Sequence, residues 1–200
     1  MGDKLLEEGT YFIRHDVIEP VVTVDNNIIQ SCFRIMDCYL ADYIETEIKK
    51  VAQDKIDDLL GMVGPLFMFA FIWSHGCTTN LEGRLKFDAF CRKLLPEMGV
   101  TIPTDGLVYD YKYDRTKKEW LKWFETVNPY EVDIKASFEQ IVVPTNDSIR
   151  MKYLCKLLLS NGKHVLCPGP TGTGKSVNTT ELISNEMPEE FLPLTMTFSA

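Results

Sequence analysis

The chain has 200 residues, of which 45% are hydrophobic and 25% are charged, and these shares are ordinary for a globular protein of one or two domains. Its formal net charge of −8 argues against a nucleic-acid partner held by a broad basic surface. Its six cysteines include no C-x-x-C pair, so neither zinc nor dithiol chemistry is indicated, and with no evident signal peptide we expect a reducing intracellular compartment.

Residues 1–100 are expected to form a mainly α-helical subdomain. Residues 1–27 are only weakly periodic, but the polar triplet 25–27 is a typical helix start, and apolar residues then recur at helical spacing to about residue 50. A further helix is expected over residues 81–95, where a proline follows and stops it.

The apolar run 59–73 predicts a buried helix that begins near Pro65 and is capped by Gly76. The run is about 15 residues long and is interrupted by two glycines and a proline, so we interpret it as too short and too broken for a membrane span of about 20 residues. His75 and Cys77 could be taken for metal ligands, but no further His or Cys lies close by in the sequence, so we interpret them as structural.

Residues 101–136 are expected to form a connector with a β-hairpin. Residues 108–113 alternate in polarity, a polar turn follows, and residues 119–124 would return as the second strand. Acidic residues interleave with the aromatic side chains of this segment, so we interpret these as cross-strand pairs rather than as a stacking platform for nucleic acid. The aromatic residues are Tyr111, Tyr113, Trp120 and Trp123.

The most specific pattern in the chain is an eight-residue motif of the form G-x-x-x-x-G-K-[ST]. It consists of Gly169, Pro170, Thr171, Gly172, Thr173, Gly174, Lys175 and Ser176. In such a loop the glycines let backbone N–H groups turn inward around the phosphates of ATP or GTP. Lys175 would lie beside the β- and γ-phosphates, and the Ser176 hydroxyl would be a Mg²⁺ ligand. The alternative is a glycine-rich surface turn.

The flanks of this motif predict an α/β fold for residues 137–200, the start of a parallel sheet. Residues 163–167 are expected to form a short buried strand, residues 176–185 a helix that stops before Pro188, and residues 192–198 a second strand. A strand, a glycine-rich loop, a helix and a strand in this order are the βαβ context that the motif requires.

A helix is also expected upstream of the first strand, capped by Thr145, Asn146 or Asp147 and closed by Asn161-Gly162. The apolar segment directly before this helix is well placed to cover an adenine. Its residues are Val142, Val143, Pro144 and Thr145.

We expect the chain by itself to be inactive as an ATPase. No apolar strand ending in Asp or Glu follows Ser176, and such an acid helps to hold Mg²⁺ in this class of enzyme. The motif begins at residue 169 and the chain ends at Ala200, so we expect a piece of a longer chain whose P-loop domain is cut after its second strand. No catalytic residue is therefore assigned within it.

Residues 142–150, 169–176 and 194–200 resemble the start of the third AAA+ module of a dynein heavy chain. Upstream, residues 71–87 look like the end of the second module's helical lid, and the 108–123 hairpin resembles the connector between these modules. The Pro-Thr-Gly-Thr-Gly-Lys-Ser form of the loop looks more like axonemal than cytoplasmic dyneins. The family commonly has Gly at one of the positions of His75 and Cys77 and an apolar residue in place of Cys167-Pro168; no phosphate-contacting position is affected.

The resemblance implies a segment of an ATP-driven microtubule minus-end motor, in which the third module binds ATP or ADP with Mg²⁺ and regulates or contributes to the mechanochemical cycle. It implies neighbouring AAA+ modules of the same chain, the microtubule and other dynein chains as partners, with no nucleic acid and no membrane. The implied location is the cytoskeleton of the cytoplasm, in the axoneme of a cilium or flagellum. An isolated Arg84 is more often a surface ion pair than a phosphate sensor, although the resemblance would let it face the preceding module's nucleotide.

Two alternatives stay open on the residues alone. The first is a module that holds and senses nucleotide without turnover. The second is an unrelated P-loop kinase with a helical N-terminal domain, which would need an acceptor site and an Arg-rich lid after the loop.

Overall fold

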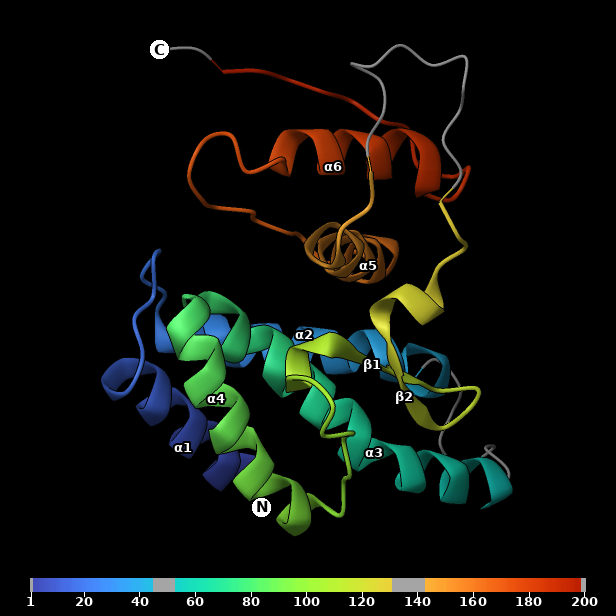
Figure 1. The fold of residues 1–200 in the computed structure, drawn as a ribbon. Coiled ribbons are helices and arrows are strands. Elements are labelled where there is room, and N and C mark those ends of the chain that lie inside the picture. Colours follow the sequence, from blue (N-terminus) through green and yellow to red (C-terminus); the bar gives the residue numbers. More distant parts are fainter. Residues whose placement is uncertain (1, 45–52, 131–142, 199–200) are drawn as a thin grey trace. The chain divides into compact units, whose positions relative to one another are not determined.

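The computed structural model describes residues 2–44, 53–130 and 143–198, and the chain divides into two units, residues 1–129 and 130–200. In the described part of the chain, the first unit holds helices α1 to α4 and a β-hairpin, and the second holds α5 and α6 on either side of the glycine-rich loop (Figure 1). The hairpin, which we expected in a separate connector, belongs to the first unit.

Helix α1, Gly2–His15, forms in the weakly periodic segment for which we predicted no helix. Its buried residues are Leu5, Leu6, Gly9 and Ile13. Gly9 lies on this buried face and leaves no room for a side chain, because an added Cβ would lie 2.4 Å from the ring of Phe71. The buried residues of α1 therefore share one face, on which Gly9 leaves room for the Phe71 ring.

Helices α2, Asp25–Ile44, and α4, Leu81–Leu94, confirm the predicted helices. The predicted continuation of the first helix from residue 45 to about residue 50 lies outside the described residues. Helix α2 begins at the predicted polar triplet. Helix α4 is capped by Asn80, whose side-chain oxygen accepts a hydrogen bond of 2.8 Å from the Gly83 N–H. The start of α4 is a local signal, because a capping oxygen satisfies N–H groups only two or three residues away.

Helix α3, Gln53–Ser74, begins well before Pro65, so the predicted start is wrong. A proline inside a helix costs roughly 3 kcal/mol or more, because it removes one hydrogen bond and crowds the preceding turn. Burial on the far side of the proline offsets this cost. Six side chains there are fully buried, namely Leu66, Met68, Phe69, Ala70, Phe71 and Ile72.

The segment Ile56–Thr78 is long and apolar enough to cross a membrane, with a mean hydropathy of 1.6. The prediction that this run is too short for a span is therefore wrong, because the helix extends upstream through Pro65. The predicted burial is confirmed: Phe69 packs on Tyr39 of α2 with ring centroids 5.8 Å apart, and Phe71 packs on Phe87 of α4 at 5.6 Å. These contacts place α3 inside the core of the first unit.

The hairpin consists of β1, Tyr111–Asp114, and β2, Glu119–Lys122, which pair antiparallel with Tyr113 opposite Trp120. The predicted hairpin and this cross-strand aromatic pair are confirmed, with the two rings 5.4 Å apart. Trp123 instead follows β2 in a 3₁₀ turn and packs against Phe69 of α3.

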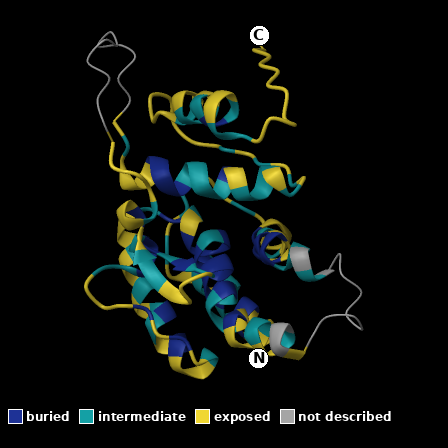
Figure 2. Cartoon of the chain, turned by 90° about the vertical axis from the view of Figure 1, so that its right-hand side faces the viewer, coloured by how far each residue is buried: buried dark blue, intermediate teal, exposed yellow. Residues whose placement is uncertain are grey.

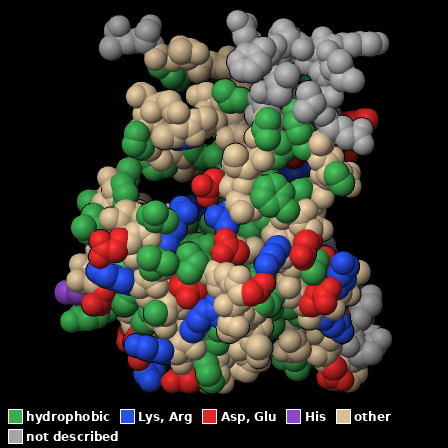
Figure 3. All heavy atoms as spheres, viewed as in Figure 1, with side chains coloured by type: hydrophobic (Ala, Val, Ile, Leu, Met, Phe, Trp, Pro, Cys, Tyr) green, Lys and Arg blue, Asp and Glu red, His purple; other side chains and the backbone are tan. Residues whose placement is uncertain are grey.

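One hydrogen bond links the two ends of this segment, and a second fastens the segment to the turn that follows α3. The indole nitrogen of Trp123 donates to the Tyr109 carbonyl at 2.8 Å, and the Tyr109 hydroxyl donates to the Gly76 carbonyl at 2.7 Å. Buried residues accordingly gather on the facing sides of the elements of the first unit (Figure 2). On the face of this unit seen in Figure 3, acidic and basic side chains are interspersed.

The second unit contains α5, Asn146–Ser160, and α6, Lys175–Glu181, which a π-helical turn, Leu182–Glu186, extends. Thr145 caps α5: its hydroxyl accepts from the Ser148 N–H at 3.2 Å, and the Ser148 hydroxyl accepts from the Thr145 N–H at 2.8 Å. Gly162, with φ of +67°, closes the helix. The predicted helices of this unit and the cap and closure of α5 are confirmed.

The two strands predicted at residues 163–167 and 192–198 do not form in the described part of the chain, where the hairpin is the only sheet. Leu166, Leu192 and Leu194 are 88%, 95% and 78% exposed. A strand requires a neighbour that pairs with its backbone N–H and C=O groups, and alternation in the sequence does not supply one. The described residues contain no such neighbour for either segment.

His75, at the end of α3, is fully buried. Its Nδ1 lies 2.9 Å from the Ser74 hydroxyl, and its Nε2 lies 3.4 Å from the Thr10 hydroxyl of α1. Burial, together with repulsion by Arg14, lowers the pKa of His75 from 6.5 to about 4. The imidazole is therefore a neutral member of the core, and the described residues contain no cluster of three or more His, Cys, Asp or Glu that would hold a metal.

Gly9→Ala is expected to lower the free energy of unfolding of the first unit by about 1–3 kcal/mol, because the new methyl group would overlap the buried ring of Phe71. Gly61→Ala is the matched control, since no atom lies within 4 Å of its added Cβ, and a gain of about 0.5–1 kcal/mol is expected from helix propensity. Urea unfolding followed by tryptophan fluorescence reports this unit alone, because all three tryptophans lie in it. Equal stability of the two variants would contradict the packing described for α1.

Acidification is expected to destabilise the first unit through His75. Because its folded pKa of about 4 is below its ordinary 6.5, the unfolded state binds a proton that the folded state lacks between these values. Stability is therefore lost as pH falls from 6.5 toward 4, by on the order of 3 kcal/mol. The His75→Gln variant should show a smaller loss over the same range, and identical pH slopes for the two proteins would refute the assignment.

Candidate functional site

The glycine-rich loop lies between an extended segment, residues 163–168, and the first turn of α6. Gly172 and Gly174 have φ values of +78° and +75°, in the left-handed region. A side chain at either position would be strained, whereas glycine adopts this conformation at no steric cost. The glycines thus provide the tight turn that the motif predicted, and Gly174 passes the chain directly into the helix.

Lys175, the first residue of α6, directs its side chain back across the loop. Its ammonium group donates hydrogen bonds to the Pro170 carbonyl and, at 2.9 Å, to the Thr173 hydroxyl. The Thr173 hydroxyl in turn donates to the Pro170 carbonyl at 3.1 Å. The structure therefore brings Lys175 and the loop residues together and places one positive charge against the backbone of the turn.

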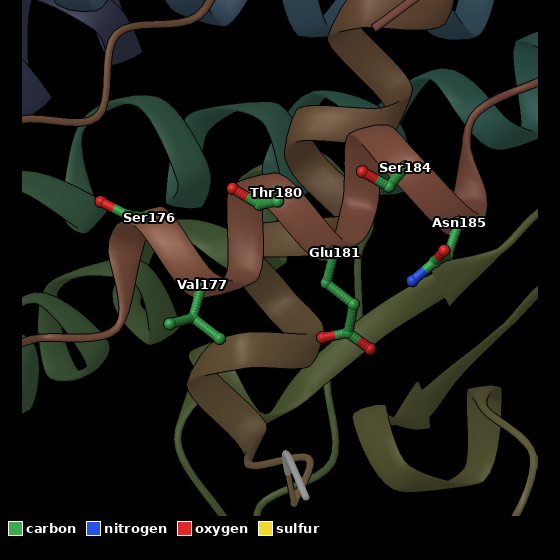
Figure 4. Close-up of a pocket in the computed structure, with 6 residues that line it drawn as sticks. All are labelled: Ser176, Val177, Thr180, Glu181, Ser184 and Asn185. Carbon is green, nitrogen blue, oxygen red and sulfur yellow. The ribbon is translucent and has the colours of Figure 1, made fainter. Parts of the chain in front are cut away.

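Ser176, the second residue of α6, is exposed. It lies at one end of a shallow hollow of about 420 Å³ along α6, shown in Figure 4. Six residues line this hollow, namely Ser176, Val177, Thr180, Glu181, Ser184 and Asn185. None of the residues 169–175 does so. The hollow is a feature of the helix surface, and the candidate site is the loop that precedes it.

The segment predicted to line an adenine leads into α5. Val142 lies outside the described residues, Val143 is 62% exposed, and Pro144 is half-buried. The side chain of Thr145 caps the N-terminus of α5. The role of these four residues toward adenine stays a prediction.

Two acidic residues that follow the loop, Glu181 of α6 and Glu186 of the π-helical turn after it, form ion pairs with α5. The ammonium group of Lys152, on α5, lies 2.7 Å from a Glu181 carboxylate oxygen and 3.0 Å from one of Glu186. This bridge joins α5 to α6 and the turn that follows it. The sequence carried no local signal for the bridge, because its partners lie about 30 residues apart and meet only through tertiary packing.

Arg84, considered as a nucleotide sensor or a surface ion pair, lies with its guanidinium carbon 5.6 Å from the centre of the Tyr109 ring. This is the geometry of a cation–π contact. The contact places Arg84 against the segment that joins α4 to the hairpin.

Comparisons with known proteins agree with this division. The family model described as the dynein heavy chain AAA lid domain matches residues 1–125, and that described as the P-loop containing dynein motor region matches residues 130–200. Dynein axonemal heavy chain 1 of Mus musculus is 31% identical, and that of Homo sapiens 30% identical, each over 98% of this chain. Dynein axonemal heavy chain 12 of Mus musculus is 39% identical over 67% of it.

The chain spans about 5% of the length of each of these relatives. The lid model alone covers more than half of the chain, and the model of the P-loop region begins five residues after the lid model ends. The mainly helical first unit, the small antiparallel sheet and the loop before α6 are the structural counterparts of these two matches. The chain therefore belongs to the dynein heavy chain family, in which it comprises an AAA lid and the start of the P-loop domain that follows.

Proposed function

We propose that residues 169–176 bind ATP or ADP with Mg²⁺ and that this site is the nucleotide site of the third AAA+ module of a dynein heavy chain. The observation that carries the proposal is the Lys175 ammonium group, which lies against a loop turned by Gly172 and Gly174. On binding, phosphate oxygens would replace the Pro170 carbonyl and the Thr173 hydroxyl as partners of Lys175. Charge-assisted hydrogen bonds to phosphate are about twice as strong as neutral ones, which favours this exchange.

The proposed roles of the other site residues follow from their positions within the motif and upstream of it. Ser176 would bind Mg²⁺ through its exposed hydroxyl, and residues 142–145 would cover the adenine. The first unit would be the lid of the second module. Neighbouring AAA+ modules of the same heavy chain would then be its immediate partners.

The positions of the acidic residues in the second unit favour a site that binds nucleotide without hydrolysing it. Glu181 and Glu186 are paired with Lys152, and Glu189 and Glu190 lie exposed in the turn that follows Pro188. None of them ends a strand beside the loop in the described structure, where an acid would help to hold Mg²⁺. We propose that the site holds nucleotide and regulates the motor cycle, with a sensing module that never turns over as the alternative.

The relatives suggest where such a motor works. Those reported above are named axonemal, and a further relative, 31% identical over 67% of this chain, is named the Dynein-1-beta heavy chain of the flagellar inner arm I1 complex of Chlamydomonas reinhardtii. We propose that the chain is part of an ATP-driven, minus-end-directed microtubule motor in the axoneme of a cilium or flagellum. Its further partners would be the microtubule and other dynein chains. The family matches give no support to the P-loop kinase alternative.

Lys175→Ala is expected to weaken MgATP binding by about 10- to 150-fold, the range that corresponds to a lost charge-assisted contact of about 1.5–3 kcal/mol. The loss should come without loss of fold, because Lys175 is at the surface end of α6. Isothermal titration calorimetry of the full chain measures the affinity, and far-UV circular dichroism checks the fold. Lys156→Ala removes the same charge from the exposed face of α5 and is the matched control. Unchanged affinity in Lys175→Ala would refute the loop assignment.

The 200-residue chain is expected to hydrolyse no ATP above background, because its acids near the loop are engaged or exposed away from it. Release of inorganic phosphate from MgATP is the measurement, with Lys175→Ala as the control for contaminating enzymes. Turnover that disappears in Lys175→Ala would show that this chain supplies a complete catalytic site and would overturn the expectation.

A further inference from the structure

The side chain of Thr173 joins Lys175 to the backbone of the glycine-rich loop. The Thr173 hydroxyl accepts a hydrogen bond of 2.9 Å from the Lys175 ammonium group and donates one of 3.1 Å to the Pro170 carbonyl. The ammonium group also donates directly to that carbonyl. The three groups thus form a closed set, in which each is hydrogen-bonded to the other two.

A hydroxyl suits the middle position of this set, because one oxygen atom has to accept from the cation and donate to the carbonyl. Thr173 is exposed, so burial does not account for the place of its side chain. The branched Cβ of threonine restricts rotation of the side chain and limits the entropy lost in holding the hydroxyl there. The hydroxyl therefore acts on the position of Lys175.

The same set competes with a phosphate for the ammonium group. An ammonium group has three N–H donors, and two of those of Lys175 are used by the loop, which leaves one. Contact with the β- and γ-phosphates at once, as the motif requires, needs at least one of the loop bonds to break. Among the described residues no carboxylate forms a salt bridge with Lys175, so the oxygens of the loop are the groups that a nucleotide has to displace.

We propose that the Thr173 hydroxyl sets the nucleotide affinity of the loop: it holds Lys175 in the nucleotide-free chain, and a polyphosphate has to displace it from the ammonium group. The inference rests on the proposed function, because the competition matters only if residues 169–176 bind a polyphosphate. Thr173 acts through Lys175 and is therefore a positioning residue of the site.

The competition has a definite kinetic signature. The apparent affinity of a ligand falls by the fraction of the protein that is ready to bind it, so releasing Lys175 raises the affinity. A contact that exists only in the nucleotide-free loop slows association and leaves the dissociation rate unchanged, because the contact is already broken in the bound state. A hydroxyl that merely shaped the loop would act on dissociation, since its removal would loosen the bound state.

The test uses the full chain with Mg²⁺ and the fluorescent nucleotide mant-ATP in stopped-flow measurements. Thr173→Val keeps the shape of the side chain and removes the hydroxyl. Its Kd is expected to fall by about two- to tenfold, the range for one net hydrogen bond, through faster association at an unchanged dissociation rate. Thr173→Ser restores a hydroxyl and should bring the Kd back toward that of the wild type. Thr180→Val makes the same exchange at an exposed position of α6 outside the loop and is the matched control.

Two results would overturn the inference and leave the proposed function standing. One is a wild-type chain that binds mant-ATP together with a Thr173→Val variant of equal or weaker affinity. The other is a change in affinity that arises from the dissociation rate. Far-UV circular dichroism of each variant shows that the fold is kept.

A second measurement needs no nucleotide. Trace acetylation of the nucleotide-free chain, followed by mass spectrometry, reports the reactivity of Lys175 relative to Lys156, which is exposed on α5. We expect this ratio to rise at least twofold in Thr173→Val, because the hydroxyl no longer holds the ammonium group. Equal ratios in the two proteins would overturn the inference alone. A raised ratio in a chain that binds no mant-ATP would instead overturn the proposed function, and the affinity-setting role with it.

Discussion

Burial of α3 is the constraint on which the first unit depends. A fully buried Leu, Ile, Met or Phe contributes about 1.5–3 kcal/mol, so the buried stretch after Pro65 outweighs the cost of a proline inside the helix. Three elements pack against α3: α2 through Tyr39, α4 through Phe87, and the hairpin segment through Trp123. The lid and the segment that follows it therefore form one unit.

The second unit depends on local interactions instead. Left-handed glycines turn the loop, Lys175 braces it through the Pro170 carbonyl, and Thr145 caps the neighbouring helix. One non-local link, the Lys152 bridge to Glu181 and Glu186, joins the two helices. The loop can thus take its shape while residues 164–168 have no strand partner in the described structure, because none of the hydrogen bonds described for the loop comes from a sheet.

The segments that the sequence predicted correctly are those whose signals lie within a few residues. The start of α2, the cap of α5, the turn between the two strands and the helix after the loop belong to this class. The start of α3 was misplaced because burial, not Pro65, decides where that helix runs. Helix α1 was missed because residues 1–27 were taken together as weakly periodic, although Leu5, Leu6 and Ile13 share one buried face of the helix. The loop of the candidate site was located from the sequence because its motif is contiguous, and the roles of its residues toward nucleotide stay a prediction.

The sequence by itself determined the loop motif, the helix caps and the family resemblance, since each rests on residue types at fixed short spacings. Only the tertiary structure decided that His75 is buried and neutral and that Lys152 joins α5 to α6. The physical reason is that burial and charge pairing depend on which distant segments pack together. Residue spacing along the chain does not encode those distances, and the free energy of the whole fold selects them.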